Sequence, residues 1–265
     1  MADLKMETLS CQIDDGLARV RFIQGERGNP FDGPFCRDMC DLSVELSCRD
    51  DVRAVLLAAD GRFFSVGGDI RAFLKDLDQL SRIIKAWTAD VHMAITRFQR
   101  MNAPVICAVH GDVAGGAVSL VAMSDIVYAA QGVKFNAAFS MIGYCGDSGS
   151  TVSLSSRMGF ARAKRFLMLS EVLEAKDAEA AGLVDYVVPA DELTASADAM
   201  ARRLAAGPTL AYGAIKRTML SARHQPLEAQ LEAEAQALAA LASTHDAREG
   251  LTAFGERRKP KFLGK

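Results

Sequence analysis

Two pairs of glycines, Gly67-Gly68 and Gly115-Gly116, stand where strand-like segments run into helix-like segments. At such a turn the first N–H groups of the helix have no partner within the helix, and they carry the positive end of its dipole. Glycine allows a ligand to approach this backbone closely. The N–H groups of Gly68 and Gly116 are therefore candidates for an oxyanion hole, which stabilises negative charge on a carbonyl oxygen.

Other interpretations of these glycines remain open, because each pair alone is a weak signal. Most Gly-Gly pairs are simple turns or points of close packing. A phosphate-binding loop is a further interpretation. Nucleotide binding has little support, however, since the sequence has no GxxxxGK[ST] motif and no strand followed by GxGxxG.

The elements around the glycines alternate between strand and helix patterns. Strand patterns cover residues 17–23, 52–59, 104–111, 126–130 and 133–135, and a further strand in residues 63–70 runs into a glycine-rich turn. Helix patterns cover residues 35–49, 71–101 and 114–123. This alternation predicts an α/β fold. Later segments are mainly helical, with helices expected at residues 192–206, 208–223 and 227–243. We therefore place an α/β core at residues 1–195 and a helical C-terminal region at residues 196–265.

The composition argues against several classes of function. A net charge of −2 over 265 residues provides no global positive field for nucleic acid or an anionic membrane. Residues 257–265 are basic and are expected to form a solvated tail. The N-terminus resembles no secretory signal and no run is long enough to span a bilayer, so we expect a cytoplasmic protein. The six cysteines form no CxxC pair or zinc spacing, so free thiols and no metal site are expected.

Four segments resemble the signatures of the crotonase superfamily, the enoyl-CoA hydratases and isomerases. FFSVGGDI is similar to the motif F-S/A-x-G-x-D, and PVICAVHGDVAGGAVSL is similar to P-V-I-A-x-V-x-G-x-x-x-G-G. EAKDAEAAGLVDYVVP and EGLTAFGERRKPKF resemble two later motifs of the family. The resemblance implies a crotonase-type spiral of ββα repeats with a C-terminal helical trimerisation region, assembled as a homotrimer or a dimer of trimers.

The same resemblance implies an acyl-CoA substrate, with coenzyme A arriving as part of that substrate and no cofactor permanently bound. Gly68 and Gly116 match the donors to the thioester carbonyl. Val66 matches a position that lines the adenine pocket, and Phe254 and Arg257 match positions that contact the CoA moiety, often from a neighbouring subunit.

Arg71 follows the first motif, where its charge could meet a phosphate. For the basic residues, plain surface charge is an equally good interpretation.

The two glutamates of the family's hydratases are absent here. Ser119 stands three residues after the second oxyanion glycine, and Phe139 stands at the second glutamate position. Neither side chain can move protons as a glutamate pair does, so ordinary hydration is in doubt. FNAAFSMIGYCGDSGST, which contains Asp147, resembles the isomerase branch that acts on the ring epoxide of phenylacetyl-CoA, where an aspartate moves protons. Dienoyl-CoA isomerases and 4-chlorobenzoyl-CoA dehalogenase have an aspartate at the same position.

Asp147 can take a proton from one carbon and return it to another, which shifts a double bond. Burial against Phe139 and Ile142 would raise its pKa and suit it to this task. The competing interpretation is a cap on a helix that begins near Ser148. His92 matches the catalytic histidine of the dehalogenase and is expected to assist, although a packed or surface histidine is the more common alternative.

The predicted function is isomerisation of an enoyl-CoA double bond through an enolate held by the two glycines. Hydration by a non-standard acid/base set, and an inactive protein that binds a CoA thioester or associates with RNA, remain alternatives. Dehalogenation is less favoured, because Phe139 replaces the indole of the dehalogenase. The sequence does not identify the acyl group of the substrate. The large side chains that either line its pocket or belong to the core are Phe63, Trp87, Phe139 and Met141.

Overall fold

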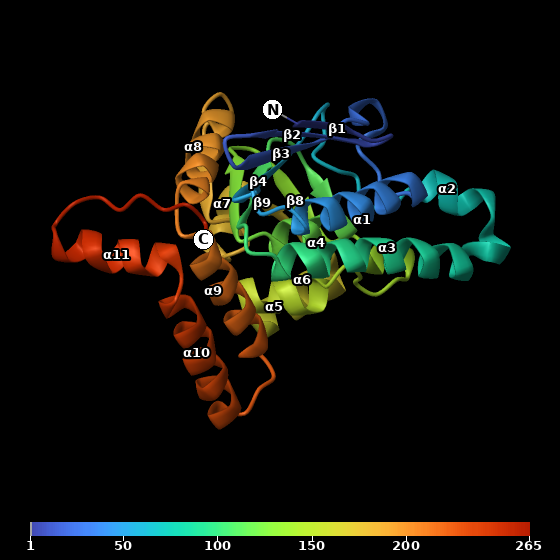
Figure 1. The fold of residues 1–265 in the computed structure, drawn as a ribbon. Helices are drawn as coiled ribbons and strands as arrows, with labels where there is room; N and C mark the ends of the chain where they lie inside the picture. The colour runs from blue at the N-terminus through green and yellow to red at the C-terminus, as the bar shows by residue number, and fades with distance from the viewer. Residues whose placement is uncertain (1) are drawn as a thin grey trace.

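The computed structural model describes residues 2–265, and its centre is a seven-stranded sheet (Figure 1). The strands lie in the order β1-β2-β3-β4-β5-β7-β10. They are β1 (Ala2–Lys5), β2 (Leu9–Asp14), β3 (Leu17–Phe22), β4 (Ala54–Ala59), β5 (Val105–Val109), β7 (Ile126–Ala130) and β10 (Tyr186–Val188). Strand β2 pairs with β1 and with β3 in antiparallel orientation. From β3 to β10, each strand is parallel to its neighbour in the sheet. Parallel strands are usually covered on both faces, which explains the continuous apolar sequences of β4 and β5.

A second, small sheet joins β6 (Val113–Ala114), β8 (Lys134–Asn136) and β9 (Val172–Glu174). It contacts the helices α4 (Gly116–Met123) and α7 (Ala175–Ala180). Helix α5 (Ser150–Met158) packs on α4, and α6 (Phe160–Leu169) packs on α5. The whole of α4 is buried up to its last residue, because its sequence GAVSLVAM has almost no polar side chain. This burial fixes the start of α4, and therefore Gly116, within the core.

Helices α1 (Gly33–Ser47) and α3 (Leu80–Arg100) pack along each other beside the main sheet (Figure 1). Asp32 caps α1 by accepting a hydrogen bond from the Phe35 N–H at 3.0 Å. The predicted single helix at residues 71–101 is in fact two helices. The first, α2 (Ile70–Lys75), ends at Asp76, and a 3₁₀ turn at Leu77–Gln79 precedes α3, because Asp76 caps that turn rather than continuing the helix.

The strand expected in residues 63–70 is not regular, which corrects that part of the prediction, whereas the glycine-rich turn into which it runs is present. Two isolated bridges hold this segment, one between Ser65 and Val113 and the other between Phe31 and Gly68. A continuous strand is interrupted because Gly67 has a φ of +78°. The irregular path brings the first glycine turn next to β6 and the second glycine turn.

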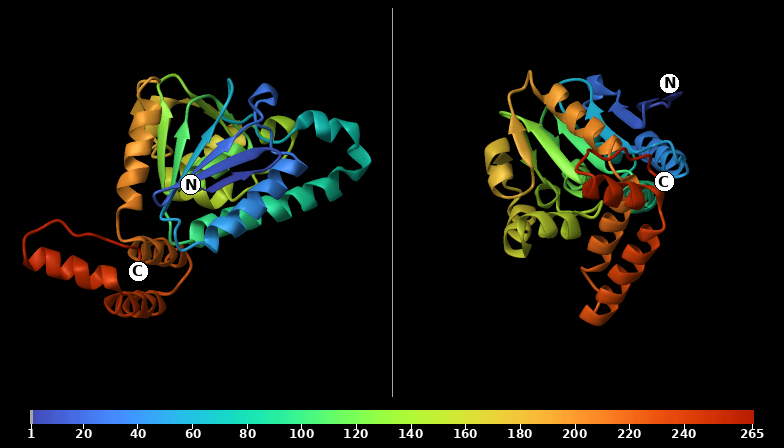
Figure 2. Two further views of the ribbon diagram at one scale, coloured as in Figure 1. Left: turned by 45° about the horizontal axis from the view of Figure 1, so that its top comes forward. Right: turned by 60° about the vertical axis from the view of Figure 1, so that its left-hand side comes forward.

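Three helices follow the core: α9 (Thr209–Ser221), α10 (Leu227–Ala242) and α11 (His245–Gly255). Figures 1 and 2 show α10 and α11 projecting from the body of the molecule, on the side opposite α2. By contrast, α8 (Leu193–Ala205) packs on β4, β5 and β7 and buries Ala197, Ala201 and Ala205 in the core. The division at residue 195 stays a prediction, but α8 lies with the sheet rather than with the projecting helices.

No helix within residues 2–265 has the length and apolar character needed to cross a bilayer.

Candidate functional site

One cavity of about 590 Å³ brings both glycine turns and Asp147 together. Gly68, Gly115 and Gly116 form part of its wall, beside Asp147 and Ser148. Most of the remaining wall is apolar or aromatic, and includes Phe31, Val66, Ile70, Phe73, Ile84, Trp87, Val91, Phe139, Met141, Ile142 and Tyr144. An apolar cavity with a few placed polar groups is the usual form of a small-molecule site.

The backbone of the second glycine turn leaves an N–H group free for a ligand. The amide of Gly115 donates to the Asn136 carbonyl at 3.0 Å, and that of Val118 donates to the Gly115 carbonyl at 3.0 Å. Within residues 2–265, the Gly68 and Gly116 amides make none of the backbone hydrogen bonds found in loops and turns. Gly116 is also the first residue of α4, where the helix dipole favours negative charge.

The two glycine turns touch each other, and glycine is required for this contact. A Cβ atom on Gly67 would lie 2.6 Å from the carbonyl oxygen of Ala114, and its φ of +78° already disfavours other residues. A Cβ atom on Gly115, whose φ is +55°, would lie 3.9 Å from the Gly68 nitrogen. The free amides therefore belong to neighbouring segments that share one cavity.

Asp147 is the carboxylate that lies against this pair of amides. A Cβ atom on Gly116 would be 3.1 Å from Asp147 Oδ1, so the carboxylate is next to the start of α4. Asp147 Oδ1 is buried and has no hydrogen-bond partner. Burial raises the pKa of Asp147, and the nearby Ser148 hydroxyl opposes this rise. A buried carboxylate that favours the protonated form is suited to taking up and releasing a proton.

The alternative that Asp147 caps a helix is wrong for the helix that follows. Helix α5 begins at Ser150, its N-cap is Gly149, and no side chain caps it. The backbone carbonyl of Asp147, not its carboxylate, accepts a hydrogen bond from the Ser150 N–H at 2.8 Å. The carboxylate therefore has no role in starting α5.

His92 lies near Asp147 but is not part of the cavity wall. Its Nε2 accepts a hydrogen bond from the Ser148 N–H at 3.0 Å. Ser119, at the position of a missing glutamate, is buried in α4, and its hydroxyl donates to the carbonyl oxygen of Asp147 at 3.1 Å. Both side chains therefore hold the backbone on which Asp147 stands.

Val66 lies in the cavity wall, and its role at the adenine stays a prediction, whereas the other proposed CoA contacts lie outside this wall. Arg71 is exposed on α2. Phe254, which is 86% exposed, and Arg257 lie at the end of α11 (Figures 1 and 2), far from α2 in this chain. Their contact with CoA stays a prediction.

Several cavity residues were not foreseen from the sequence. Phe31 lies in a turn before α1, and Tyr144 lies in the loop that leads to Asp147. Phe73 comes one helical turn after Asp69 and pairs with Trp87, with ring centroids 5.3 Å apart. Of the side chains considered for the acyl pocket, Trp87, Phe139 and Met141 line the cavity and Phe63 does not.

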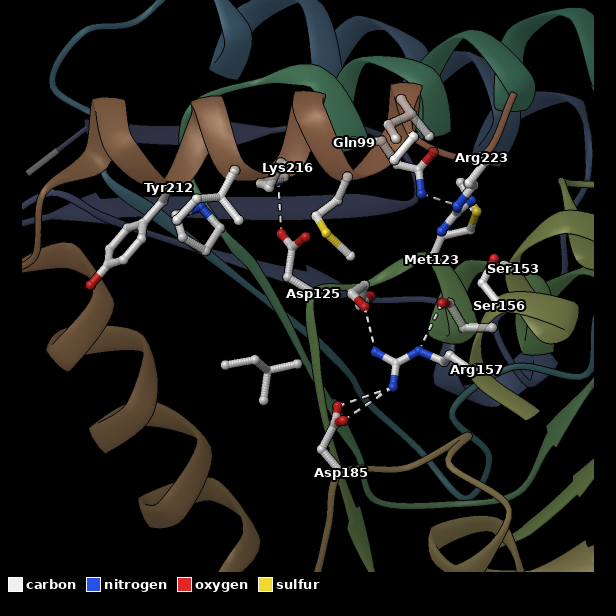
Figure 3. A pocket seen from close by; sticks show the side chains of 18 of the residues that line it. Gln99, Met123, Asp125, Ser153, Ser156, Arg157, Asp185, Tyr212, Lys216 and Arg223 are labelled. Atoms are coloured by element: carbon white, nitrogen blue, oxygen red, sulfur yellow. Dashed lines mark hydrogen bonds and ion pairs between the residues drawn. The ribbon is translucent and has the colours of Figure 1, made fainter. Parts of the chain in front are cut away.

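A second cavity, of about 750 Å³, lies between α9 and the core (Figure 3). Of its charged side chains, Lys216, Asp125, Arg157 and Asp185 are paired with one another or with backbone carbonyls, whereas Arg223 is exposed at the rim. Lys216 contacts Asp125 at 2.7 Å and also donates to the carbonyls of Phe98 and Ala103. All three ammonium donors are therefore used, and the Lys216 side chain fastens α9 to the core rather than offering charge to a ligand.

Arg157 is occupied in the same way at the other end of this second cavity. Figure 3 shows it between Asp185 and the core. It donates to the carbonyls of Ala122 and Ser124 at 2.9 and 2.6 Å and pairs with Asp185 at 3.1 Å. Within residues 2–265 no cluster of three or more histidine, cysteine or acidic side chains could hold a metal ion.

Comparison with protein families gives a match to the one described as enoyl-CoA hydratase/isomerase, over residues 12–265. The chain is 32% identical to 1,2-epoxyphenylacetyl-CoA isomerase of Escherichia coli (strain K12), covering 98% of this chain and 100% of that protein. It is 30% identical to a protein named probable enoyl-CoA hydratase in Rhodobacter capsulatus, covering 99% and 100% of the two chains.

Among solved structures, the enoyl-CoA hydratase of Mycobacterium smegmatis superimposes with a TM-score of 0.89 at 26% identity. The superposition covers 96% of this chain and 98% of that one. This agreement confirms the α/β spiral with C-terminal helices that the sequence motifs implied. The relatives include both isomerases and hydratases, so the choice between these reactions rests on the residues of the cavity.

Proposed function

The chain belongs to the enoyl-CoA hydratase/isomerase family, and from that premise we propose that it shifts a double bond in an acyl-CoA thioester. Enzymes of this family act on CoA thioesters, typically without a bound cofactor. The proposed substrate enters with its acyl group in the apolar cavity and its thioester oxygen at Gly68 and Gly116. Coenzyme A is thus part of the substrate.

Two amide donors at the thioester oxygen make the adjacent carbon more acidic. When the α-carbon loses a proton, the electron pair of the broken C–H bond is delocalised onto the thioester oxygen, which carries the negative charge of the enolate. Donors that are already in place stabilise this charge without reorganising. The free amides of Gly68 and Gly116, in one cavity wall, support this role.

The observation that carries the proposal is the buried, unpartnered Oδ1 of Asp147 next to Gly116. In the proposed reaction this carboxylate removes a proton from the α-carbon of a β,γ-enoyl thioester and returns it at the γ-carbon, which gives the α,β-enoyl thioester; the reverse reaction takes the proton from the γ-carbon and returns it at the α-carbon. The double bond moves by one position and no atom is gained or lost. One carboxylate is sufficient for such a transfer.

The test compares Asp147→Asn with wild type, using a β,γ-enoyl-CoA as substrate. We expect kcat to fall about 100- to 10,000-fold, because the variant has no proton acceptor. Asp191→Asn, an exposed carboxylate outside the cavity, is the matched control and should leave kcat unchanged. Wild-type turnover by Asp147→Asn would remove Asp147 from the mechanism.

Hydration is the second candidate reaction, and the same cavity argues against its usual form. Asp147 is the one carboxylate among the described residues of the wall, and Phe139 occupies a position where a hydratase has glutamate. Hydration of crotonyl-CoA at a rate comparable to isomerisation would favour a hydratase. Thermal stabilisation by acyl-CoA without turnover would instead favour an inactive thioester-binding protein.

The proposal includes self-association, as a homotrimer or a dimer of trimers. Helices α10 and α11 expose large apolar side chains that a monomer leaves in water: Leu227, Leu231, Leu238, Leu251 and Phe254. A second copy would bury this surface, and it would place Phe254 and Arg257 near another chain's cavity. A cytoplasmic location stays a prediction.

A further inference from the structure

The backbone turn that carries Asp147 is held in an unfavourable conformation. Ser148 has a φ of +50° and Gly149 has a φ of +78°, and the Ser150 N–H closes the turn on the Asp147 carbonyl at 2.8 Å. Glycine adopts positive φ readily, whereas serine does so only when its surroundings enforce it. Some other part of the molecule must therefore hold Ser148.

The bond from Ser148 to His92 provides this restraint. Ser148 is 1% exposed, so its N–H group cannot turn to water. The imidazole Nε2 of His92, on α3, accepts this N–H at 3.0 Å. Without this hydrogen bond, the buried N–H group of Ser148 would have no acceptor, and buried amides without an acceptor are rare in folded proteins.

Ser119 restrains the other side of the same peptide. Its hydroxyl donates to the Asp147 carbonyl at 3.1 Å, while His92 accepts from the following N–H. The peptide that joins Asp147 to Ser148 is thus held at both its oxygen and its nitrogen, by side chains of α4 and α3. The Asp147 carboxylate stands at one end of this peptide, beside Gly116.

We propose that His92 is a positioning residue, whose unprotonated Nε2 holds the Ser148 amide and thereby aims the Asp147 carboxylate at the thioester. It takes no proton from the substrate, since it lies outside the cavity wall. The inference rests on the proposed role of Asp147 as the proton carrier. Ser119 assists, but the Asp147 carbonyl keeps its bond from the Ser150 N–H when the Ser119 hydroxyl is removed.

The hydrogen-bond geometry makes Nε2 of His92 an acceptor, because the backbone N–H of Ser148 can only donate. One turn away on α3, its neighbours are Thr88 and Thr96, which are uncharged and bond to carbonyls of their own helix. The acceptor role also fixes the tautomer, with the ring proton on Nδ1.

Two substitutions separate positioning from proton transfer. In His92→Gln the side-chain amide oxygen can accept the Ser148 N–H but cannot act as a base near neutral pH. In His92→Leu no acceptor remains. Met93→Leu, the next residue along α3 and outside the cavity wall, is the matched control.

With a β,γ-enoyl-CoA, we expect His92→Leu to lower kcat about 100-fold, because a small displacement of Asp147 impairs proton transfer. KM should change less than about threefold, since the oxyanion amides and acyl pocket stay intact. His92→Gln should keep kcat within about threefold of wild type, and Met93→Leu should match wild type. Ser119→Ala should lose less activity than His92→Leu.

Two results would overturn the inference. Wild-type kcat in His92→Leu would show that the bond to Ser148 does not position Asp147. A loss in His92→Gln equal to that in His92→Leu would show that the imidazole itself is needed as an acid or base. An amide NMR spectrum supplies a readout independent of activity, because the Ser148 N–H resonance should shift in His92→Leu and stay near its wild-type position in His92→Gln.

The activities of Asp147→Asn and His92→Leu together distinguish failure of the proposed function from failure of the role given to His92. If Asp147→Asn retains wild-type turnover, the proposed function itself is wrong. If Asp147→Asn is inactive while His92→Leu turns over normally, the proposed function stands and only the role of His92 is rejected.

Discussion

A buried carboxylate without a partner lowers the stability of the protein that carries it. Burial raises the pKa of Asp147 above its ordinary value of 3.8, so the folded state binds a proton there more tightly than the unfolded chain does. The stability of the folded state therefore falls as pH rises from 3.8 through the raised value, and above that value the full penalty is present. Residues kept for catalysis often carry such a penalty.

Asp147→Asn should therefore stabilise the protein at neutral pH, while it abolishes activity. The amide has nearly the same shape and needs no desolvated charge, so we expect a higher Tm than wild type at pH 8. As pH falls toward the ordinary pKa of Asp147, the gap between the two melting temperatures should narrow. Thermal unfolding of both proteins across this pH range measures the effect. A lower Tm for the variant at pH 8 would mean that the carboxylate is favourably paired in the folded protein.

Local sequence identifies some site residues and not others. The glycine pairs and Asp147 stand in motifs whose neighbours resemble known signatures, so a shared site could be predicted, and one cavity brings them together. The contact between His92 and Ser148 joins residues 56 positions apart in the chain, and it depends on how α3 lies against the turn before α5. No local pattern specifies that packing. The same reason explains why Phe31 was missed as part of the cavity wall.

At the scale of elements, periodicity predicted most helices and strands but not the irregular segments. The helix expected at residues 227–243 is α10, at Leu227–Ala242. The strand expected in residues 63–70 is reduced to isolated bridges at Ser65 and Gly68, because positive φ at Gly67 interrupts the extended backbone. The helical spacing of residues 71–101 gives no sign that the helix is interrupted at Asp76, because the interruption depends on a capping hydrogen bond of that side chain.

Helix α9 is the element that joins the projecting helices to the core, and Lys216 fastens it. Its ammonium group is buried against Asp125 and two carbonyls (Figure 3). Burial lowers the pKa of Lys216, and the charge of Asp125 opposes this change. Removing one member of a buried pair leaves the other without its counter-charge.

Lys216→Met should lower the free energy of unfolding by about 3 kcal/mol, because Asp125 loses its cation and two carbonyls lose their donor. Urea denaturation, compared at equal m-values, measures the loss. Lys164→Met, at an exposed position of α6, is the control and should change little. Adding Asp125→Asn should recover part of the loss, since the uncompensated charge is then gone. A Lys216→Met protein as stable as wild type would show that α9 is held by apolar packing alone.

At the scale of the whole molecule, the projecting helices carry apolar surface that a single chain does not bury. In one chain, α10 and α11 project from the rest of the fold (Figures 1 and 2). Several of their large apolar side chains are exposed. Leu238 is 71% exposed and Phe254 is 86% exposed. Burying such side chains between copies is favourable, and it would also bring the C-terminal residues to a second active site. On this view, a monomer has the reacting groups but lacks part of the surface that holds CoA.

Mixing two inactive variants tests this arrangement. The first, Asp147→Asn, has an intact C-terminus, and the second carries Phe254→Ala with Arg257→Ala and has an intact Asp147. If the C-terminus of one copy completes the cavity of another, co-refolding equal amounts should restore about a quarter of the wild-type activity, because half of the cavities have Asp147 and half of their neighbours have a working C-terminus. Sedimentation of each variant checks that assembly is unchanged. Activity that stays at the level of the separate variants would place Phe254 and Arg257 outside the CoA site of any copy.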